Sequence, residues 1–274
     1  MKDMCIALCR SLFLHHRCVC VHASLRAAGL PGLRAEMLLD ALLSLGNTVL
    51  VPTFSDAYAA WPLGRPPIAQ NGCDVPIPPG ADNASVPIYT PDTLALDTAD
   101  MGVLAACVLR HPAHVRGNHP LNSFTAIGPQ AAELVQDQQP MDVYAPLRAL
   151  MARDGYILLW GTTLTSCTAL HLSEQLAGRH SFLRWAKGPD GQVMEVQAGG
   201  GSRAFEAAFA GPLSPLCTQA VCGHAVLRCY PARALVQRAA QLIRQTPEMT
   251  HCGRPNCARC RDAVLGGPQA FRPL

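Results

Sequence analysis

Short apolar stretches alternate along this chain with segments of helical spacing, and this alternation limits the possible folds more than any other feature. The clearest stretch is Tyr156-Ile-Leu-Leu-Trp160, which a helix-like run follows shortly afterwards. Further strands are predicted at residues 17–22 and 48–51, helices at residues 36–45, 100–110, 129–135 and 231–244, and a hairpin around Gly191. Such alternation is typical of layered α/β domains. The sequence therefore predicts a mixed β-sheet flanked by helices in layers.

We expect the 274 residues to form a single domain, over residues 1–274, with a substantial core. A proline- and glycine-rich excursion at residues 61–93 interrupts the pattern with eight prolines and three glycines. Long segments without periodicity in a compact domain are usually lids or binding loops. A cysteine-containing tail at residues 251–274 ends the chain.

Composition excludes several classes of protein. The hydrophobic fraction is 49% and the charged fraction 15%, which excludes global disorder. The net charge of +3 is small and the arginines are scattered singly, so no nucleic-acid partner is expected. We find no apolar run of membrane-spanning length and expect no membrane association.

The cysteines indicate a reducing compartment. There are thirteen of them, an odd number at irregular spacing, which does not suit a disulfide framework. The apolar N-terminal stretch from Met1 to Leu14 is interrupted by Arg10 and lacks a small-residue cleavage site, so it is not read as a signal peptide. A cytoplasmic location is expected.

The candidate catalytic residues follow the 156–160 strand. Thr168, His171 and Glu174 are spaced three apart, so a helix would place them on one face. A base, a carboxylate that orients it and a nearby hydroxyl are the parts that general base catalysis requires. The alternative is an ordinary helix surface, because polar pairs at this spacing are common.

Two other segments could bind a ligand. Residues 21–26 lie at a strand end, where backbone amides with Ser24 and Arg26 suit a phosphate group, although Ser24 is equally a plain helix cap. Residues 116–124 form a polar run between helices, suited to a ligand loop or to a turn fixed by Pro120.

The tail raises the question of a metal. His251, Cys252, Cys257 and Cys260 are four soft ligands within ten residues, and the last two cysteines have the two-residue gap common in zinc sites. A second complete pair is lacking, so we expect free thiols packed as small hydrophobic groups and no metal. The glycines at 199–201 lack the lysine of a phosphate-binding loop and are interpreted as a turn.

Six ordered blocks between Arg17 and Ala263 resemble the aminoglycoside 3-N-acetyltransferase family. The blocks are Val21-His-Ala-Ser-Leu25; Val51-Pro-Thr-Phe-Ser55; Asp100-Met-Gly102 with Arg116-Gly-Asn-His-Pro120 and Ser123-Phe-Thr-Ala-Ile-Gly128; Gly155 to Trp160 with Thr168, His171 and Glu174; Gly223-His-Ala225; and Cys257-Ala-Arg-Cys-Arg-Asp-Ala263. The resemblance implies that family's fold and direct transfer of acetyl from acetyl-coenzyme A to a primary amine, the 3-amino group of an aminoglycoside antibiotic.

The resemblance also implies roles for residues. His171 becomes the general base, Glu174 holds its tautomer, and Thr168 supports the thioester carbonyl. Asp56 and Asp100 become acceptor contacts. The implied contacts to coenzyme A are His22, Ala23, Ser24, Leu25, Arg26, Thr53, Ser55, Arg116, His119 and Ser123. No metal is required, and the protein is expected to be a monomer or homodimer.

Departures from the family pattern affect both ligands. Gly117 and Ala145 replace serines, which removes two hydroxyls from the coenzyme A side. The loop at residues 198–203 is neutral apart from Arg203, whereas relatives place acidic residues there for a polycationic acceptor. Aspartates in or beside the excursion could compensate, namely Asp74, Asp82, Asp92, Asp97 and Asp100.

Two other classes of function stay open at this point. Cys167 lies four residues before His171, so a Cys–His nucleophile could support a ping-pong acyltransferase or a hydrolase. The tail cysteines could instead belong to a non-catalytic zinc-binding interaction module.

Overall fold

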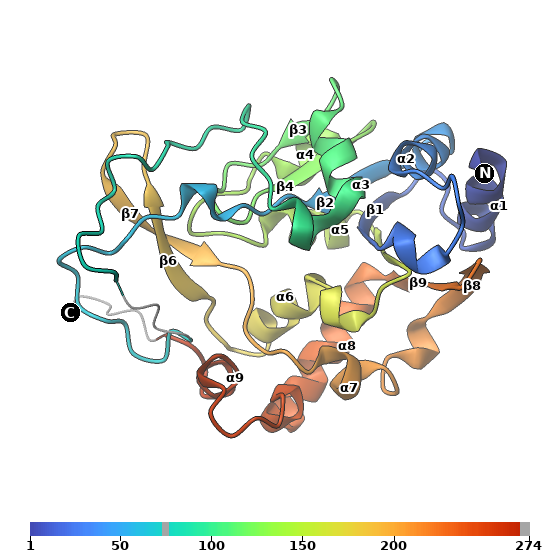
Figure 1. Ribbon diagram of the computed structural model, residues 1–274. Coiled ribbons are helices and arrows are strands. Elements are labelled where there is room, and N and C mark those ends of the chain that lie inside the picture. The colour runs from blue at the N-terminus through green and yellow to red at the C-terminus, as the bar shows by residue number, and fades with distance from the viewer. Residues whose placement is uncertain (73–76, 269–274) are drawn as a thin grey trace.

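A seven-stranded mixed sheet forms the centre of the computed structural model, which describes residues 1–72 and 77–268 (Figure 1). In spatial order the strands are β3 (Val115–Arg116), β4 (Phe124–Ile127), β2 (Thr48–Pro52), β1 (Cys18–Ala23), β5 (Tyr156–Trp160), β9 (Ala225–Pro231) and β8 (Thr218–Cys222). β2, β1 and β5 run parallel, and the other pairings are antiparallel.

Helices cover both faces of the sheet and confirm the predicted fold class. Alternate residues of β1 show why: Cys18 and Cys20 belong to one core, while Val19 and Val21 belong to the other. The first core contains residues of α4 (Ala131–Val135), α5 (Ala145–Ala152), α6 (Ala169–Leu176), α7 (Phe205–Phe209) and α8 (Ala232–Gln245). The second contains residues of α1 (Lys2–Ser11), α2 (Ala35–Ser44) and α3 (Thr98–Arg110).

The remaining elements lie outside these layers. β6 (Phe182–Lys187) and β7 (Val193–Ala198) form the predicted hairpin, and α9 (Ala258–Val264) lies in the tail. Short 3₁₀ helices connect the elements, namely η1 (Leu25–Ala28), η2 (Asp56–Tyr58), η3 (Leu164–Ser166), η4 (Ser214–Leu216) and η5 (Pro247–Thr250). Among the described residues, none of the helices is long and apolar enough to cross a lipid bilayer.

The predicted long excursion is irregular and packs on the hairpin. Its described residues, 61–72 and 77–93, contain neither helix nor strand. A small third core joins Tyr58 and Tyr89 to Ala186 of β6 and Val196 of β7. The excursion and the hairpin lie together at one end of the molecule, away from the N-terminal helix (Figure 1). Asp74 lies outside the described residues.

The segment after Ala23 forms only a short helix. The structure has the four-residue 3₁₀ helix η1 there, which ends at Gly29 in a left-handed conformation (φ +61°). A side chain at that glycine would also meet the ring of His224. A backbone conformation that favours glycine, so soon after the strand, limits the helix to one turn.

Candidate active site

β5 and α6 position the candidate catalytic pair. β5 ends at Trp160, the chain turns through Gly161 and η3, and Thr168 is the N-cap residue of α6. His171 lies in the first turn of the helix and Glu174 one turn later, as their spacing predicts. The His171 Nδ1 lies 2.8 Å from Oε2 of Glu174. The structure therefore brings these two side chains together.

A buried polar cluster fixes the other oxygen of Glu174. Arg179 Nη1 donates to Oε1 over 2.7 Å, and the Ser202 hydroxyl donates to the same oxygen over 2.6 Å. Thr250 Oγ1 lies 2.9 Å from Arg179 Nη1 and 2.8 Å from the Ser202 hydroxyl. Arg179, Ser202, Glu174 and Thr250 are all buried. The carboxylate therefore has partners on both oxygens and a fixed orientation.

These partners keep Glu174 ionised. Burial alone would raise its pKa, but the hydrogen bond and charge of His171, the Ser202 hydroxyl and the Arg179 guanidinium together lower the pKa below its usual value. An ionised carboxylate can only accept, so the His171 Nδ1 must carry the proton of their hydrogen bond when the ring is neutral. The lone pair of the imidazole is then on Nε2, where it can accept a proton.

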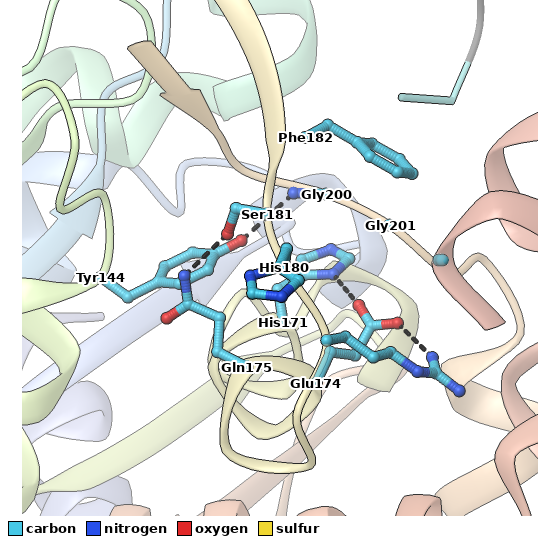
Figure 2. Close-up of a pocket in the computed structure, with 11 residues that line it drawn as sticks. Tyr144, His171, Glu174, Gln175, His180, Ser181, Phe182, Gly200 and Gly201 are labelled. Atoms are coloured by element: carbon cyan, nitrogen blue, oxygen red, sulfur yellow. Dashed lines mark hydrogen bonds and ion pairs between the residues drawn. The ribbon is translucent and has the colours of Figure 1, made fainter. Parts of the chain in front are cut away.

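The imidazole of His171 reaches a pocket. Its side chain is 18% exposed, and one side of the ring packs on Phe205 with ring centroids 4.8 Å apart. Figure 2 shows the ring among Tyr144, Gly200 and Gly201, which line this pocket. The space inside is small, about 10 Å³, enough for about one water molecule. A larger ligand must therefore approach from the open side or widen the pocket.

The loop after β7 forms one wall of the pocket. Gly200 donates its backbone N–H to the Tyr144 hydroxyl over 3.2 Å, as Figure 2 shows. A Cβ atom at Gly201 would lie 2.8 Å from Oε2 of Glu174. The glycine at this position is thus explained by the close approach of the loop to the carboxylate.

The carboxyl ends of β2, β1 and β5 meet at one edge of the sheet, since the three strands are parallel. Ligands bind outside this edge in many open α/β sheets. His22 to Arg26 follow β1, and Thr53 and Ser55 follow β2. Of these residues, Arg26 is exposed, Ala23 and Ser24 are half-buried, and the others are buried.

Two of the expected coenzyme A contacts at this edge are deeply enclosed. His22 is buried, and this burial lowers its pKa to about 4. Thr53 is fully buried, and its hydroxyl lies 2.8 Å from the hydroxyl of Thr125. Ser55 uses its hydroxyl to cap η2. Ser24 makes no side-chain cap bond, so its hydroxyl has no capping role.

Arg116 and Ser123 hold the excursion to the sheet. Arg116 donates to the Ser123 hydroxyl and to backbone oxygens of Thr53, Thr93 and Ala95. Its guanidinium also lies over the ring of Tyr89, 5.3 Å from the ring centre. The side-chain nitrogens of Arg116 are therefore all engaged within the protein.

His119 is also engaged internally. It is fully buried, and its Nε2 lies 2.7 Å from the carbonyl oxygen of Gln197. Its Nδ1 accepts from the backbone N–H groups of Leu121 and Asn122. Burial lowers the pKa of His119 to about 4. This histidine orders the turn that begins at Pro120. For residues 116–124, its hydrogen bonds therefore favour the turn over the ligand loop.

Three aspartates gather beside the edge of the sheet. The backbone N–H of Asp56 donates to Asp97 over 2.8 Å. The pKa of Asp56 is raised by burial and by the charges of Asp97 and Asp100. Gly102 of α3 lies over the end of β1, with its Cβ position 3.5 Å from the carbonyl oxygen of Ala23. The acidic group thus lies close to the 22–26 segment.

Comparison with known proteins identifies the family. A family model described as aminoglycoside 3-N-acetyltransferase matches residues 20–244. The chain belongs to this acetyltransferase family. Aminoglycoside N(3)-acetyltransferase IX of Micromonospora chalcea is 39% identical over 97 residues, 34% of each chain. Aminoglycoside N(3)-acetyltransferase III of Serratia marcescens is 29% identical over 188 residues, 64% of this chain and 65% of that protein. The matched segments thus span between a third and two thirds of these relatives' length.

Solved structures show the same fold as this member of the acetyltransferase family. Aminoglycoside acetyltransferase AAC(3)-IVa has a TM-score of 0.74 at 24% identity, covering 97% of this chain and 96% of that chain. AAC-IIIb, solved as a binary complex with CoASH, has a TM-score of 0.69 at 22% identity and covers 93% of this chain and 99% of that one.

The environment of Cys167 argues against a cysteine nucleophile in this family member. The thiol is buried, and this burial raises its pKa to about 12. Nucleophilic cysteines need a lowered pKa, because the thiolate is the reactive form. Cys167 is the C-cap residue of η3, and among the hydrogen bonds of the described residues none joins it to His171.

Arg179, Ser202, Thr250 and Tyr144 are not predicted from the sequence. Arg179 lies just beyond α6, Ser202 lies in the loop after β7, and Thr250 is the last residue of η5. No local spacing connects these positions to Glu174. A buried carboxylate needs partners, but the sequence does not say which polar residues supply them.

Proposed function

We propose that this protein transfers acetyl from acetyl-coenzyme A directly to a primary amine of an aminoglycoside, with His171 as general base. One observation carries the proposal: the 2.8 Å contact between His171 Nδ1 and an ionised Glu174 leaves Nε2 as the proton acceptor of a ring that lines the pocket. Family membership supports the reaction class. Solved structures named for complexes of relatives with a gentamicin, with sisomicin and with CoASH support the two substrates.

The chemistry requires a base because an ammonium group has no lone pair. The ammonium group first releases one proton to solvent, and Nε2 of His171 takes the second proton from the resulting amine as its nitrogen attacks the thioester carbonyl carbon. The C–N bond forms, the C–S bond breaks, and coenzyme A leaves as the thiolate. Glu174 stabilises the imidazolium that results, and the Thr168 hydroxyl supports the carbonyl oxygen while it carries negative charge.

Coenzyme A is proposed to bind at the carboxyl edge of the three parallel strands. Ser24 and Arg26 offer a hydroxyl and a permanent positive charge there, in the half-buried and exposed part of the segment. His22 and Leu25 would form part of the wall of this coenzyme A site. Arg116, His119 and Ser123 are proposed to act indirectly, because their polar atoms already hold the excursion and the 119–123 turn.

Asp56, Asp97 and Asp100 are proposed to bind the ammonium groups of the acceptor. Three carboxylates at one place favour a polycation over a simple amine. They compensate for the neutral loop at residues 199–201. A cytoplasmic location is proposed because acetyl-coenzyme A is the donor and none of the cysteines of the described residues forms a disulfide.

A thiol-release assay tests the reaction and the acceptor together. Purified protein is incubated with acetyl-coenzyme A and either a panel of aminoglycosides or simple primary amines. We expect release of coenzyme A that depends on an aminoglycoside, with intersecting double-reciprocal lines when both substrates are varied. Parallel lines together with inactivation by Cys167→Ser would instead establish a covalent acyl-enzyme. Release with simple amines alone would refute the assigned acceptor.

A further inference from the structure

Three cysteine side chains of the tail lie together, outside the proposed catalytic pair. The sulfur atoms of Cys252, Cys257 and Cys260 all lie within 4.8 Å of one another. Cys257 is the N-cap residue of α9, and Cys260 lies in its first turn. Cys252 comes from the loop that follows η5. The fold thus brings a third thiol to the Cys257–Cys260 pair.

This spacing is close to that of a metal–thiolate site. Tetrahedral Zn²⁺ with bonds of about 2.3 Å to sulfur places neighbouring sulfurs about 3.8 Å apart. The three sulfurs need to approach one another by at most about 1 Å to reach that distance. Three cysteines, two of them separated by two residues, are a ligand set typical of zinc.

The positive charges around the three cysteines favour a negatively charged centre. Arg203, Arg254 and Arg259 line a pocket together with Cys257. Within residues 1–72 and 77–268, none of these arginines forms an ion pair with a carboxylate. The Nε of Arg259 is buried and lacks a hydrogen-bond partner among the described residues. Three thiolates with one Zn²⁺ carry a net charge of −1, which would balance part of this positive charge.

The thiols differ in how easily they ionise. A hydrogen bond from the backbone N–H of Cys260 lowers the pKa of the Cys257 thiol, and the charge of Arg203 acts in the same direction. Burial raises the pKa of Cys260 to about 11. A metal that binds all three sulfurs near neutral pH must therefore displace a proton from Cys260.

We propose that Cys252, Cys257 and Cys260 bind a single structural Zn²⁺ ion, with water or another small ligand in the fourth position. The ion would tie the loop that carries Cys252 to the start of α9, beside Arg203. The site lies next to residues of the Glu174 cluster: Ser202, which precedes Arg203, donates to Glu174, and Thr250, two residues before Cys252, contacts the Ser202 hydroxyl. This role replaces the expectation that the tail cysteines are free thiols. It does not depend on the proposed reaction.

Metal analysis of the full chain tests the site without reference to activity. Protein purified without chelator is analysed for zinc and then reconstituted with Co²⁺ for absorption spectroscopy. We expect about one zinc per chain, and thiolate-to-cobalt charge-transfer bands with the intense visible bands of tetrahedral coordination. The variant Cys257→Ser should lose most of the metal. Cys107→Ser, at a half-buried cysteine of α3, should keep it.

Three results would each overturn the proposal. The first is wild-type protein that stays metal-free after reduction and incubation with Zn²⁺. The second is X-ray absorption that finds fewer than three sulfur ligands around bound zinc. The third is a double Cys257→Ser, Cys260→Ser variant that keeps zinc at the wild-type level. The first two use unmodified protein, so they decide the question even if the variants do not fold.

Discussion

At the scale of single residues, the polar cluster around Glu174 decides whether His171 can act as a base. The spacing in the sequence correctly placed the two on one helix face. It could not find Arg179, Ser202 or Thr250, because a buried carboxylate selects its partners in three dimensions. The same limit applies to Arg116 and His119, which looked like ligand residues but have their polar atoms engaged within the protein.

Arg179 provides a prediction about stability. Arg179→Met removes the cation next to a buried carboxylate, and we expect a loss of about 3–5 kcal/mol in the free energy of unfolding. Urea denaturation measures this loss. Arg233→Met is the control, because the Arg233–Asp154 pair is exposed and should contribute less than about 1 kcal/mol. Equal effects of the two substitutions would contradict the assigned role of Arg179.

At the scale of elements, the sequence predicted the parts with strong periodicity. β5, α6, α8 and the β6–β7 hairpin lie where the pattern placed them. The antiparallel strands β8 and β9 and the N-terminal helix α1 were missed. β8 is largely exposed, so it lacks a continuous apolar signal, and in α1 two buried cysteines form the core contacts in place of larger apolar side chains.

The loop after β7 offers a matched pair of substitutions. Gly201→Ala places a Cβ 2.8 Å from Oε2 of Glu174, while Gly199→Ala meets its nearest atoms at 3.6 Å, an ordinary contact. Neither Gly199 nor Gly201 has a φ angle in the left-handed region, so alanine adds no backbone strain at either position. Because the carboxylate is held on both sides, we expect Gly201→Ala to lower kcat/KM by about tenfold to a hundredfold.

Steady-state kinetics of the two variants measure the difference. Gly199→Ala should stay within about twofold of wild type, since an ordinary contact requires no movement of its neighbours. A comparable loss of kcat/KM in both variants would show that the loop responds to any added methyl group. It would contradict the explanation that Gly201 is needed for its close approach to Glu174.

At the scale of the whole molecule, the layered α/β class followed from alternation, but the strand order did not. Periodicity marks a strand without naming its neighbours, so the order β3-β4-β2-β1-β5-β9-β8 was not predictable from it. The packing of the excursion on the hairpin was equally hidden, since it depends on isolated aromatic residues such as Tyr58 and Tyr89. The assignment of residues 1–274 to one domain stays a prediction.

Two buried histidines predict how stability depends on pH. Burial lowers the pKa of His22 and His119 to about 4, against about 6.5 in an unfolded chain. Between these values the unfolded chain binds more protons than the folded one. The free energy of unfolding is therefore independent of these two groups above about pH 6.5. As the pH is lowered from 6.5 towards 4, it decreases by up to about 1.4 kcal/mol per pH unit for each histidine.

Urea denaturation at a series of pH values between neutral and mildly acidic conditions tests this slope. His22→Gln removes one of the two groups and should reduce the pH dependence while the protein stays folded at neutral pH. A free energy of unfolding that does not change over this range would contradict the assignment of two buried neutral histidines.

The central claim is that the imidazole of His171 removes the proton from the acceptor amine, and the His171→Ala variant tests it most directly. The variant and wild type are compared in the thiol-release assay after urea denaturation has shown that both are folded. His180→Ala serves as a comparison, because His180 lines the same pocket, and among the described residues no hydrogen bond or ion pair joins its side chain to Glu174. We predict that His171→Ala lowers turnover by about two to four orders of magnitude, and His180→Ala by much less. Turnover close to wild type in folded His171→Ala would contradict the claim.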